Sequence, residues 1–148
     1  MYNVLTWNCY DDAIDADQMW TGTLNNFAII TSGGHLFELD GPEGTEGETG
    51  GFDPYTIKNG YAVANSDAIQ SSDLINTDDN TGVDFDNIFI TGINEGQIIN
   101  RVTHDVGNVN FQNVVLDVAA DSLSNYVVDG NVPDGVSAGS APANAGAI

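Results

Sequence analysis

The sequence predicts an all-β domain, a short right-handed parallel β-helix (a β-solenoid), from two observations. Helical periodicity is nearly absent, and short β-favouring runs alternate with clusters of Gly, Asn and Asp. In addition, Asn precedes an apolar run at positions separated by 23, 61 and 26 residues, namely Asn3, Asn26, Asn87 and Asn113. Repeats of about this length are typical of solenoid coils, which must stack because none buries its inner face alone. If Asn merely marks turns, an antiparallel β-sandwich is the alternative.

Strands are expected where apolar and β-branched residues concentrate. The gap between Asn26 and Asn87 leaves room for one further coil near residues 56–63, and we expect Asn side chains of successive coils to stack. The expected strands are Asn3 to Trp7, Phe27 to Thr31, His35 to Leu39, Tyr61 to Ala64, Ile88 to Ile93, Ile98 to Val102, Val109 to Val118 and, more weakly, Tyr126 to Val128.

We expect one β-helix domain over residues 1–129 and a tail over residues 130–148. From Gly130 onward Gly, Ala, Ser, Pro and Val dominate, and no charged residue follows Asp134. This composition is typical of a tail or linker unless another part of the protein holds it. Residues 42–52 are acidic and rich in Gly, and we expect them to form a surface loop.

The charge of the chain excludes several partners. Asp and Glu number 22, only Lys58 and Arg101 oppose them, and the formal net charge is −20. Binding of a nucleic acid backbone needs clustered Lys and Arg, so nucleic acid is excluded, and anionic lipid surfaces repel the chain. No apolar run approaches the ~20 residues of a membrane span, so we expect no direct membrane insertion. The acidic surface attracts cations, although solubility alone is a sufficient reason for most of these side chains.

The composition also indicates an extracellular or cell-surface protein, because Asn, Asp, Thr, Ser and Gly are abundant and Lys is nearly absent. The N-terminal residues show neither a basic region nor a cleavable signal pattern, so we expect a mature fragment of a longer chain or another export route. Cys9 is the only cysteine, which excludes an intrachain disulfide, and we expect a buried thiol there.

Two segments carry a resemblance to a known family. Residues 8–24 contain the pattern Asp-Asp-x-x-Asp-x-Asp followed by Trp-Thr-Gly, and residues 33–44 contain Glu-x-Asp-Gly-Pro-Glu. Together they resemble large bacterial cell-surface or lipid-anchored proteins that form right-handed parallel β-helices. The resemblance covers residues 2–65. It implies a fold and a surface location more than an activity.

The first candidate metal site is the acidic stretch Asp11, Asp12, Asp15 and Asp17. Closely spaced oxygen ligands suit calcium, which takes ~6–8 of them, and Glu38 and Asp40 are expected to join one coil later. The alternative is that these side chains make local turn hydrogen bonds.

The second candidate is a run that contains Asp78, Asn80, Asp84 and Asp86 and reads Asp-x-Asn-x-Gly-x-Asp-x-Asp. It resembles calcium loops with alternating oxygen ligands, but its Gly stands at the fifth position and no Glu follows at the twelfth, unlike an EF-hand. Turn hydrogen bonds are again the alternative.

Whether the chain is an enzyme stays open, and no catalytic residue is assigned. Three fragments, Asn76-Thr77-Asp78, Asp11-Asp12 and Gly34-His35, resemble parts of the pectin-hydrolase pattern, but their order differs and Leu36 interrupts the last. His35 and His104 are too far apart in sequence for a zinc motif, so we expect His35 to be a turn or strand residue.

These observations predict an extracellular structural or interaction module, adhesive or self-assembling, and we expect calcium to stabilise it. We expect self-association or a place in a larger cell-surface assembly. A β-solenoid has two open ends, and no capping helix is evident, so head-to-tail stacking into a filament is expected. The alternative function is a carbohydrate-binding or carbohydrate-cleaving module with a polysaccharide as partner.

Overall fold

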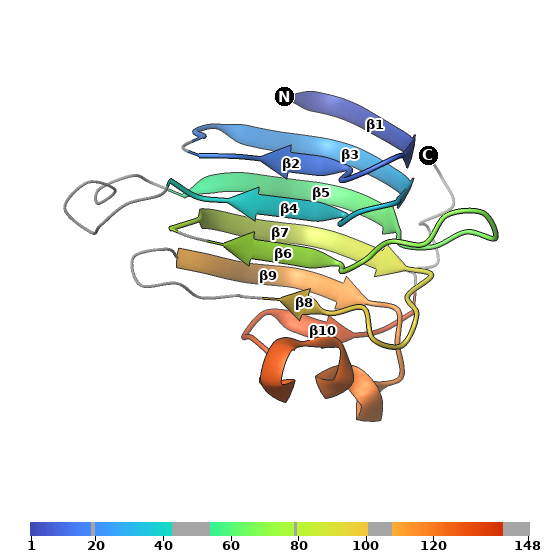
Figure 1. The fold of residues 1–148 in the computed structure, drawn as a ribbon. Coiled ribbons are helices and arrows are strands. Elements are labelled where there is room, and N and C mark those ends of the chain that lie inside the picture. The colour runs from blue at the N-terminus through green and yellow to red at the C-terminus, as the bar shows by residue number, and fades with distance from the viewer. Residues whose placement is uncertain (19, 43–53, 79, 101–107, 141–148) are drawn as a thin grey trace.

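The protein is a right-handed parallel β-solenoid of about four turns. The computed structural model describes residues 1–18, 20–42, 54–78, 80–100 and 108–140. Two sheets face each other across the core (Figure 1), with strand orders β1-β3-β5-β7-β9-β10 and β2-β4-β6-β8. The larger sheet consists of β1 (Tyr2–Cys9), β3 (Thr23–Ser32), β5 (Tyr55–Val63), β7 (Gly82–Thr91), β9 (Asn108–Leu116) and β10 (Val136–Ala138). The smaller consists of β2 (Ile14–Ala16), β4 (Phe37–Asp40), β6 (Ile75–Asp78) and β8 (Ile99–Asn100).

The chain alternates between the sheets, so each of the first four coils gives one strand to each. In Figure 1 it runs along the larger sheet behind, returns through the smaller sheet in front and descends by one strand. This winding has the right-handed sense of nearly all parallel crossovers. The paired strands are parallel throughout both sheets, which confirms the β-helix and makes the antiparallel sandwich wrong.

An asparagine column runs up the larger sheet, one residue per coil. The register places Asn59 between the positions of Asn26 and Asn87, in the coil that the sequence spacing left room for. Each member has a left-handed φ between 54° and 60°, a conformation that Asn tolerates better than most residues. The column comprises Asn3, Asn26, Asn59, Asn87 and Asn113.

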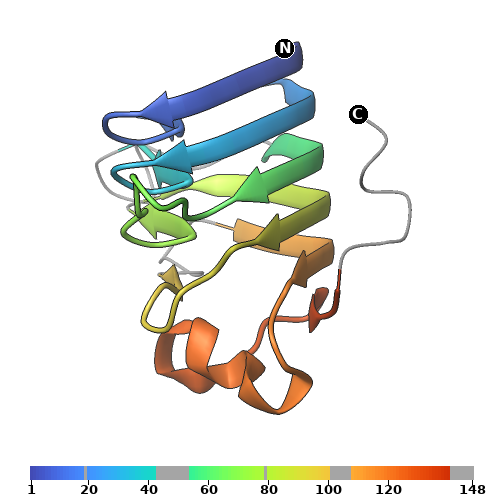
Figure 2. The same ribbon diagram turned by 90° about the vertical axis from the view of Figure 1, so that its right-hand side faces the viewer.

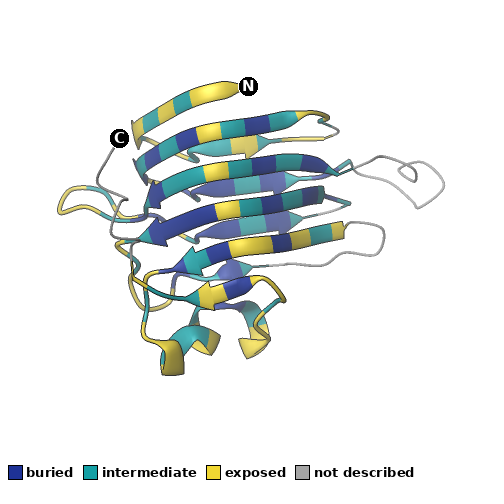
Figure 3. Ribbon diagram, turned by 180° about the vertical axis from the view of Figure 1, so that it is seen from behind, coloured by how far each residue is buried: buried dark blue, intermediate teal, exposed yellow. Residues whose placement is uncertain are grey.

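Buried residues lie along the strands of both sheets (Figure 3), and their apolar side chains form one core cluster. Apolar side chains alternate inward along each strand, as the period of two requires. Phenylalanine rings pack edge to face in this core, with ring centroids 5.8 Å apart for Phe27 and Phe37 and 5.6 Å for Phe37 and Phe85. Gly60 lies against the Phe27 ring, and a Cβ there would meet the ring Cζ at 1.9 Å.

Most of the expected strands overlap strands of the structure. The short strands β2, β6 and β10 were not predicted, because three or four residues show no periodicity. The weak strand expected at Tyr126 to Val128 is wrong. Tyr126 ends the 3-10 helix η1 (Ala120–Tyr126), Val128 begins the 3-10 helix η2 (Val128–Gly130), and Val127 between them makes a single isolated bridge. β10 lies within the expected tail and pairs with β9, so the larger sheet continues beyond residue 129. Outside the described residues lie most of the loop expected at 42–52 (all but Pro42), part of the strand expected at Ile98 to Val102 and the last eight residues of the expected tail.

The two ends of the solenoid differ. At the C-terminal end η1 and η2 cross the core (Figure 2). Val127, 4% exposed, bridges to Ile99 of β8, and Leu123 and Tyr126 pack against the core. The expectation of an uncapped C-terminal end is therefore wrong, because 3-10 segments this short carry no helical period in sequence. At the N-terminal end β1 and β2 are the edge strands of their sheets.

Candidate functional site

In the part of the chain that the structure describes, β1 is an edge strand of the larger sheet, and it carries no charge. Its sequence, Tyr-Asn-Val-Leu-Thr-Trp-Asn-Cys, contains no acidic or basic residue, although the chain carries a net charge of −20. Its side chains Tyr2, Leu5 and Trp7 are 73%, 62% and 68% exposed. Among the described residues, the exposed large apolar side chains are confined to residues 1–10 and Val132. The apolar surface of this acidic protein is thus concentrated at one end.

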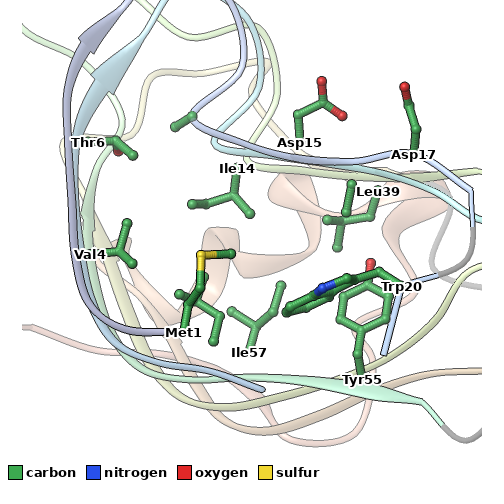
Figure 4. Close-up of a pocket in the computed structure, with 13 residues that line it drawn as sticks. Met1, Val4, Thr6, Ile14, Asp15, Asp17, Trp20, Leu39, Tyr55 and Ile57 are labelled. Atoms are coloured by element: carbon green, nitrogen blue, oxygen red, sulfur yellow. The ribbon is translucent and has the colours of Figure 1, made fainter. Parts of the chain in front are cut away.

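The interior of the first coils opens at this end into a cavity of about 460 Å³ (Figure 4). Apolar side chains such as Val4, Ile14 and Leu39 line it. Two buried hydroxyl groups on its wall, Thr6 Oγ1 and Tyr55 Oη, have no hydrogen-bond partner among the described residues. Burial raises the pKa of Tyr55, so its hydroxyl stays protonated and can donate. A buried hydroxyl group without a hydrogen bond destabilises the folded state. At this end, the described structure leaves two such groups without their polar contacts.

A second cluster joins the first coil to the second. Asp12 lies in the turn between β1 and β2, His35 precedes β4 and Glu38 lies within it. One oxygen of Asp12 accepts from the His35 backbone N–H at 2.5 Å and lies 2.9 Å from His35 Nδ1. Glu38 Oε1 lies 3.5 Å from the same nitrogen. One ligand atom from each of the three side chains falls within 4.8 Å of the others.

The carboxyl groups of Asp12 and Glu38 interact, and their pKa values are shifted in opposite directions. A hydrogen bond with Asp12, together with burial and the negative charge of Asp12, raises the pKa of Glu38 to about 7. Burial by itself raises the pKa of Asp12, but hydrogen bonds from the His35 backbone, Glu38 and the His35 ring outweigh it and lower that pKa. Of the two carboxyl groups, Glu38 therefore keeps its proton to the higher pH.

Gly34 makes room for this arrangement. A Cβ at Gly34 would lie 2.4 Å from Asp12 Oδ1 and 2.7 Å from Asp11 Oδ1, so only a residue without a side chain lets both carboxylates approach the second coil. The Ser32 hydroxyl donates to the His35 carbonyl at 2.8 Å and helps to fix this segment.

The structure brings the first predicted metal set into one area. Asp15 lies in β2 opposite Glu38, as the sequence suggested for the next coil. Burial, followed by the charges of Asp17, Asp12 and Asp11, raises the pKa of Asp15. Asp40 pairs instead with Asp78 of the following coil. Calcium at this set remains a prediction.

His35 is the member that sequence reasoning missed. It follows Asp12 by 23 residues, the same separation as between Asn3 and Asn26. A search for polar residues at that offset finds it, whereas a search for a short zinc motif does not.

The second predicted set spreads over several elements. Asp78 ends β6, and Asn80 in the following turn donates to the Pro42 carbonyl at 2.8 Å. Asp84 and Asp86 lie on β7, where Asp84 accepts from Asn110 at 2.8 Å. Asp86 accepts from Asn113 at 3.5 Å and pairs across the sheet with Lys58. Calcium at this set also remains a prediction.

The fragments that resemble the pectin-hydrolase pattern also lie on different elements. Asp11 and Asp12 belong to the first turn, His35 to the second coil and Asn76 to β6. In the part of the chain that the structure describes, no helix has the length and apolar character needed to span a bilayer. Comparison with protein-family models, with curated proteins and with solved structures returned no match to this chain.

Proposed function

We propose that the protein is a structural module, outside the cell or on its surface, that associates with a second copy of itself through its N-terminal end. The observation that carries this proposal is the uncharged, apolar edge strand β1 on a chain with a net charge of −20. The extracellular location is supported by composition, which is rich in Asn, Asp, Thr, Ser and Gly and poor in Lys.

An exposed edge strand offers a row of unpaired backbone groups to any other strand. Soluble proteins usually block such edges with charges, Pro or bulges. β1 has no charge and no Pro, and it presents Tyr2, Leu5 and Trp7 to solvent. A partner strand would bury these side chains and cover the mouth of the cavity where Thr6 and Tyr55 have no hydrogen-bond partner within the described ranges. The β1 edge therefore offers both features of an interface, namely backbone groups that can pair with a strand and apolar side chains that a partner can bury.

Electrostatic repulsion favours this contact over others between two copies. With 22 acidic residues and few basic ones, most faces of two copies repel one another. The residues of β1 contribute no charge to that repulsion. A contact limited to β1 therefore brings no like charges of the strand itself together.

The closed C-terminal end determines the geometry of the assembly. Head-to-tail stacking needs two open ends, but η1 and η2 cover the C-terminal end. Two N-terminal ends can instead meet about a two-fold axis, with β1 beside β1 of the other copy. Such an isologous contact uses the same surface twice and closes at a dimer. We therefore propose a dimer in place of the filament expected from the sequence.

The experiment compares Leu5→Glu with Val132→Glu by light scattering over a series of concentrations. Both variants place the same charge at an exposed apolar position, one on β1 and one near the capped end. Leu5→Glu should weaken the dimer at least ~10-fold, because like charges meet across the two-fold axis, and Val132→Glu should dimerise like the parent. A parent protein that stays monomeric at millimolar concentration, or equal effects of both variants, contradicts the proposal.

A second candidate function, carbohydrate binding, is favoured by a groove on the outside of the larger sheet. The groove has a volume of about 410 Å³ and is lined by Asn26, Asn59, Asn87 and Tyr61. Amide groups can hydrogen-bond sugar hydroxyls, and the Tyr61 ring, stacked on Phe89 with centroids 5.7 Å apart, offers an apolar surface.

Retention on a panel of neutral polysaccharides tests this second candidate. Binding that Tyr61→Ala weakens and Leu5→Glu leaves intact supports it, and release of reducing ends would extend it to cleavage. Absence of retention by the parent protein rules it out for the sugars on the panel.

A further inference from the structure

We propose that Asp12, His35 and Glu38 form a site for a first-row transition-metal dication such as Zn²⁺, which joins the first coil to the second. The donor set is one imidazole nitrogen and two carboxylates. Calcium prefers six or more oxygen ligands, whereas an imidazole nitrogen suits zinc and its neighbours in the first row. The inference is independent of dimerisation.

The geometry of the three groups is close to that of a zinc site. Zinc bonds of about 2.0–2.2 Å in a tetrahedral arrangement place ligand atoms about 3.4 Å from one another. His35 Nδ1 lies 2.9 Å from the Asp12 oxygen and 3.5 Å from the Glu38 oxygen. All three ligand atoms lie within 4.8 Å of each other. Side-chain shifts below 1 Å would therefore bring the three atoms to coordinating distances.

The charge of the cluster lacks a permanent positive partner in the described part of the chain. The Asp12 side chain is only 10% exposed, and its ionic partner is His35, which is charged only when protonated. Lys58 lies on β5 opposite Asp86, in the other sheet. A dication would neutralise both carboxylates at once.

The fold supplies the ligands from two coils. Asp12 comes from the turn after β1, and His35 and Glu38 come from the segment around β4. The bare backbone of Gly34 lets the Asp12 carboxylate reach that segment. A bound ion would therefore link the N-terminal coil to its neighbour, and three protein ligands leave at least one coordination position for water.

Isothermal calorimetry and Co²⁺ absorption spectroscopy test the site on protein stripped of metal with a chelator. The parent protein should bind one equivalent of Zn²⁺, and bound Co²⁺ should give visible d–d bands. His35→Gln should lower Zn²⁺ affinity at least ~10-fold and abolish the Co²⁺ spectrum. Asp67→Asn, which removes one exposed carboxylate elsewhere, and His104→Gln, which removes the other histidine, should bind like the parent.

Three results would overturn the proposal. The first is absence of stoichiometric Zn²⁺ binding by the parent protein. The second is equal binding by His35→Gln and the parent, which would assign the ion to diffuse acidic charge. The third is displacement of Zn²⁺ by an equal concentration of Ca²⁺, which would indicate an all-oxygen site. Should His35→Gln not fold, judged by circular dichroism, Glu38→Gln replaces it with the same expected loss of affinity.

Discussion

The side-chain amide of Asn87 donates a hydrogen bond to Oδ1 of Asn59 at 2.7 Å, and both residues have a left-handed backbone, with φ of 55° and 57°. The same conformation recurs at Asn3 and Asn26, where Asn26 donates to Asn3 at 2.6 Å. The column therefore combines a backbone requirement with hydrogen bonds between coils. Asn meets both, because it tolerates positive φ and carries a donor and an acceptor.

Substitution of Asn59 separates these two contributions. Asn59→Ala should lower the free energy of unfolding by about 1–3 kcal/mol, because Ala is strained at positive φ and the amide contacts are lost. Asn59→Gly should lower the free energy of unfolding by about 1 kcal/mol less than Asn59→Ala. Gly adopts positive φ without strain, but like Ala it lacks the side-chain hydrogen bonds. Urea titration measures both values. Equal losses would show that backbone conformation does not matter at this position.

Gly60→Ala should destabilise the protein by about 3 kcal/mol, because the new Cβ would lie 1.9 Å from Phe27 Cζ in the packed core. Gly82→Ala is the matched control, since its Cβ would meet nothing closer than Pro54 at 3.6 Å. The control should change the free energy of unfolding by no more than about 0.5 kcal/mol. A similar melting temperature for both variants would contradict the packing described for Phe27.

Val127→Ala tests the C-terminal cap. Val127 is 4% exposed and bridges to Ile99, so loss of its methyl groups should cost about 2 kcal/mol. Val132→Ala, at an exposed position close by in the sequence, should stay within about 0.5 kcal/mol of the parent. If the two variants unfold at the same urea concentration, the segment does not contribute to the core.

The Asp12–Glu38 pair predicts a pH dependence for protein free of metal. The pKa of Glu38 rises from 4.5 to about 7 on folding, so the folded state binds more protons than the unfolded state between these values. Stability from this group is therefore lost as pH rises through this window, and the lowered pKa of Asp12 acts in the opposite direction below pH 3.8. Glu38→Gln should flatten the change in urea midpoint between pH 5 and pH 8, and an unchanged slope would contradict the shared proton.

The coil repeat is visible in the sequence because each coil of the larger sheet needs a residue that tolerates positive φ at one position, and that residue is Asn. Asn59 does not match the pattern of Asn before an apolar run, because Lys58 and Gly60 flank it. The spacing between Asn26 and Asn87 nevertheless leaves room for its coil. The short strands β2 and β6 escaped for another reason. Their three or four residues show no period, and only pairing with the neighbouring coil defines them.

The candidate metal centre was predictable in part. The acidic stretch pointed to Asp12, and the expectation of a contribution from the next coil pointed to Glu38. His35 is not evident from the sequence, because zinc motifs have short spacing, whereas a solenoid brings together residues one coil apart. The change from an expected calcium site to a proposed transition-metal site follows from this one residue.

Amide hydrogen exchange at several protein concentrations tests the proposed N-terminal contact most directly. If β1 pairs with a second copy, exchange of its edge amides should slow as concentration rises, while exchange in η1 and η2 stays constant. Leu5→Glu should abolish the concentration dependence. Dimer formation with unchanged exchange in β1, or protection confined to the C-terminal end, would contradict the account.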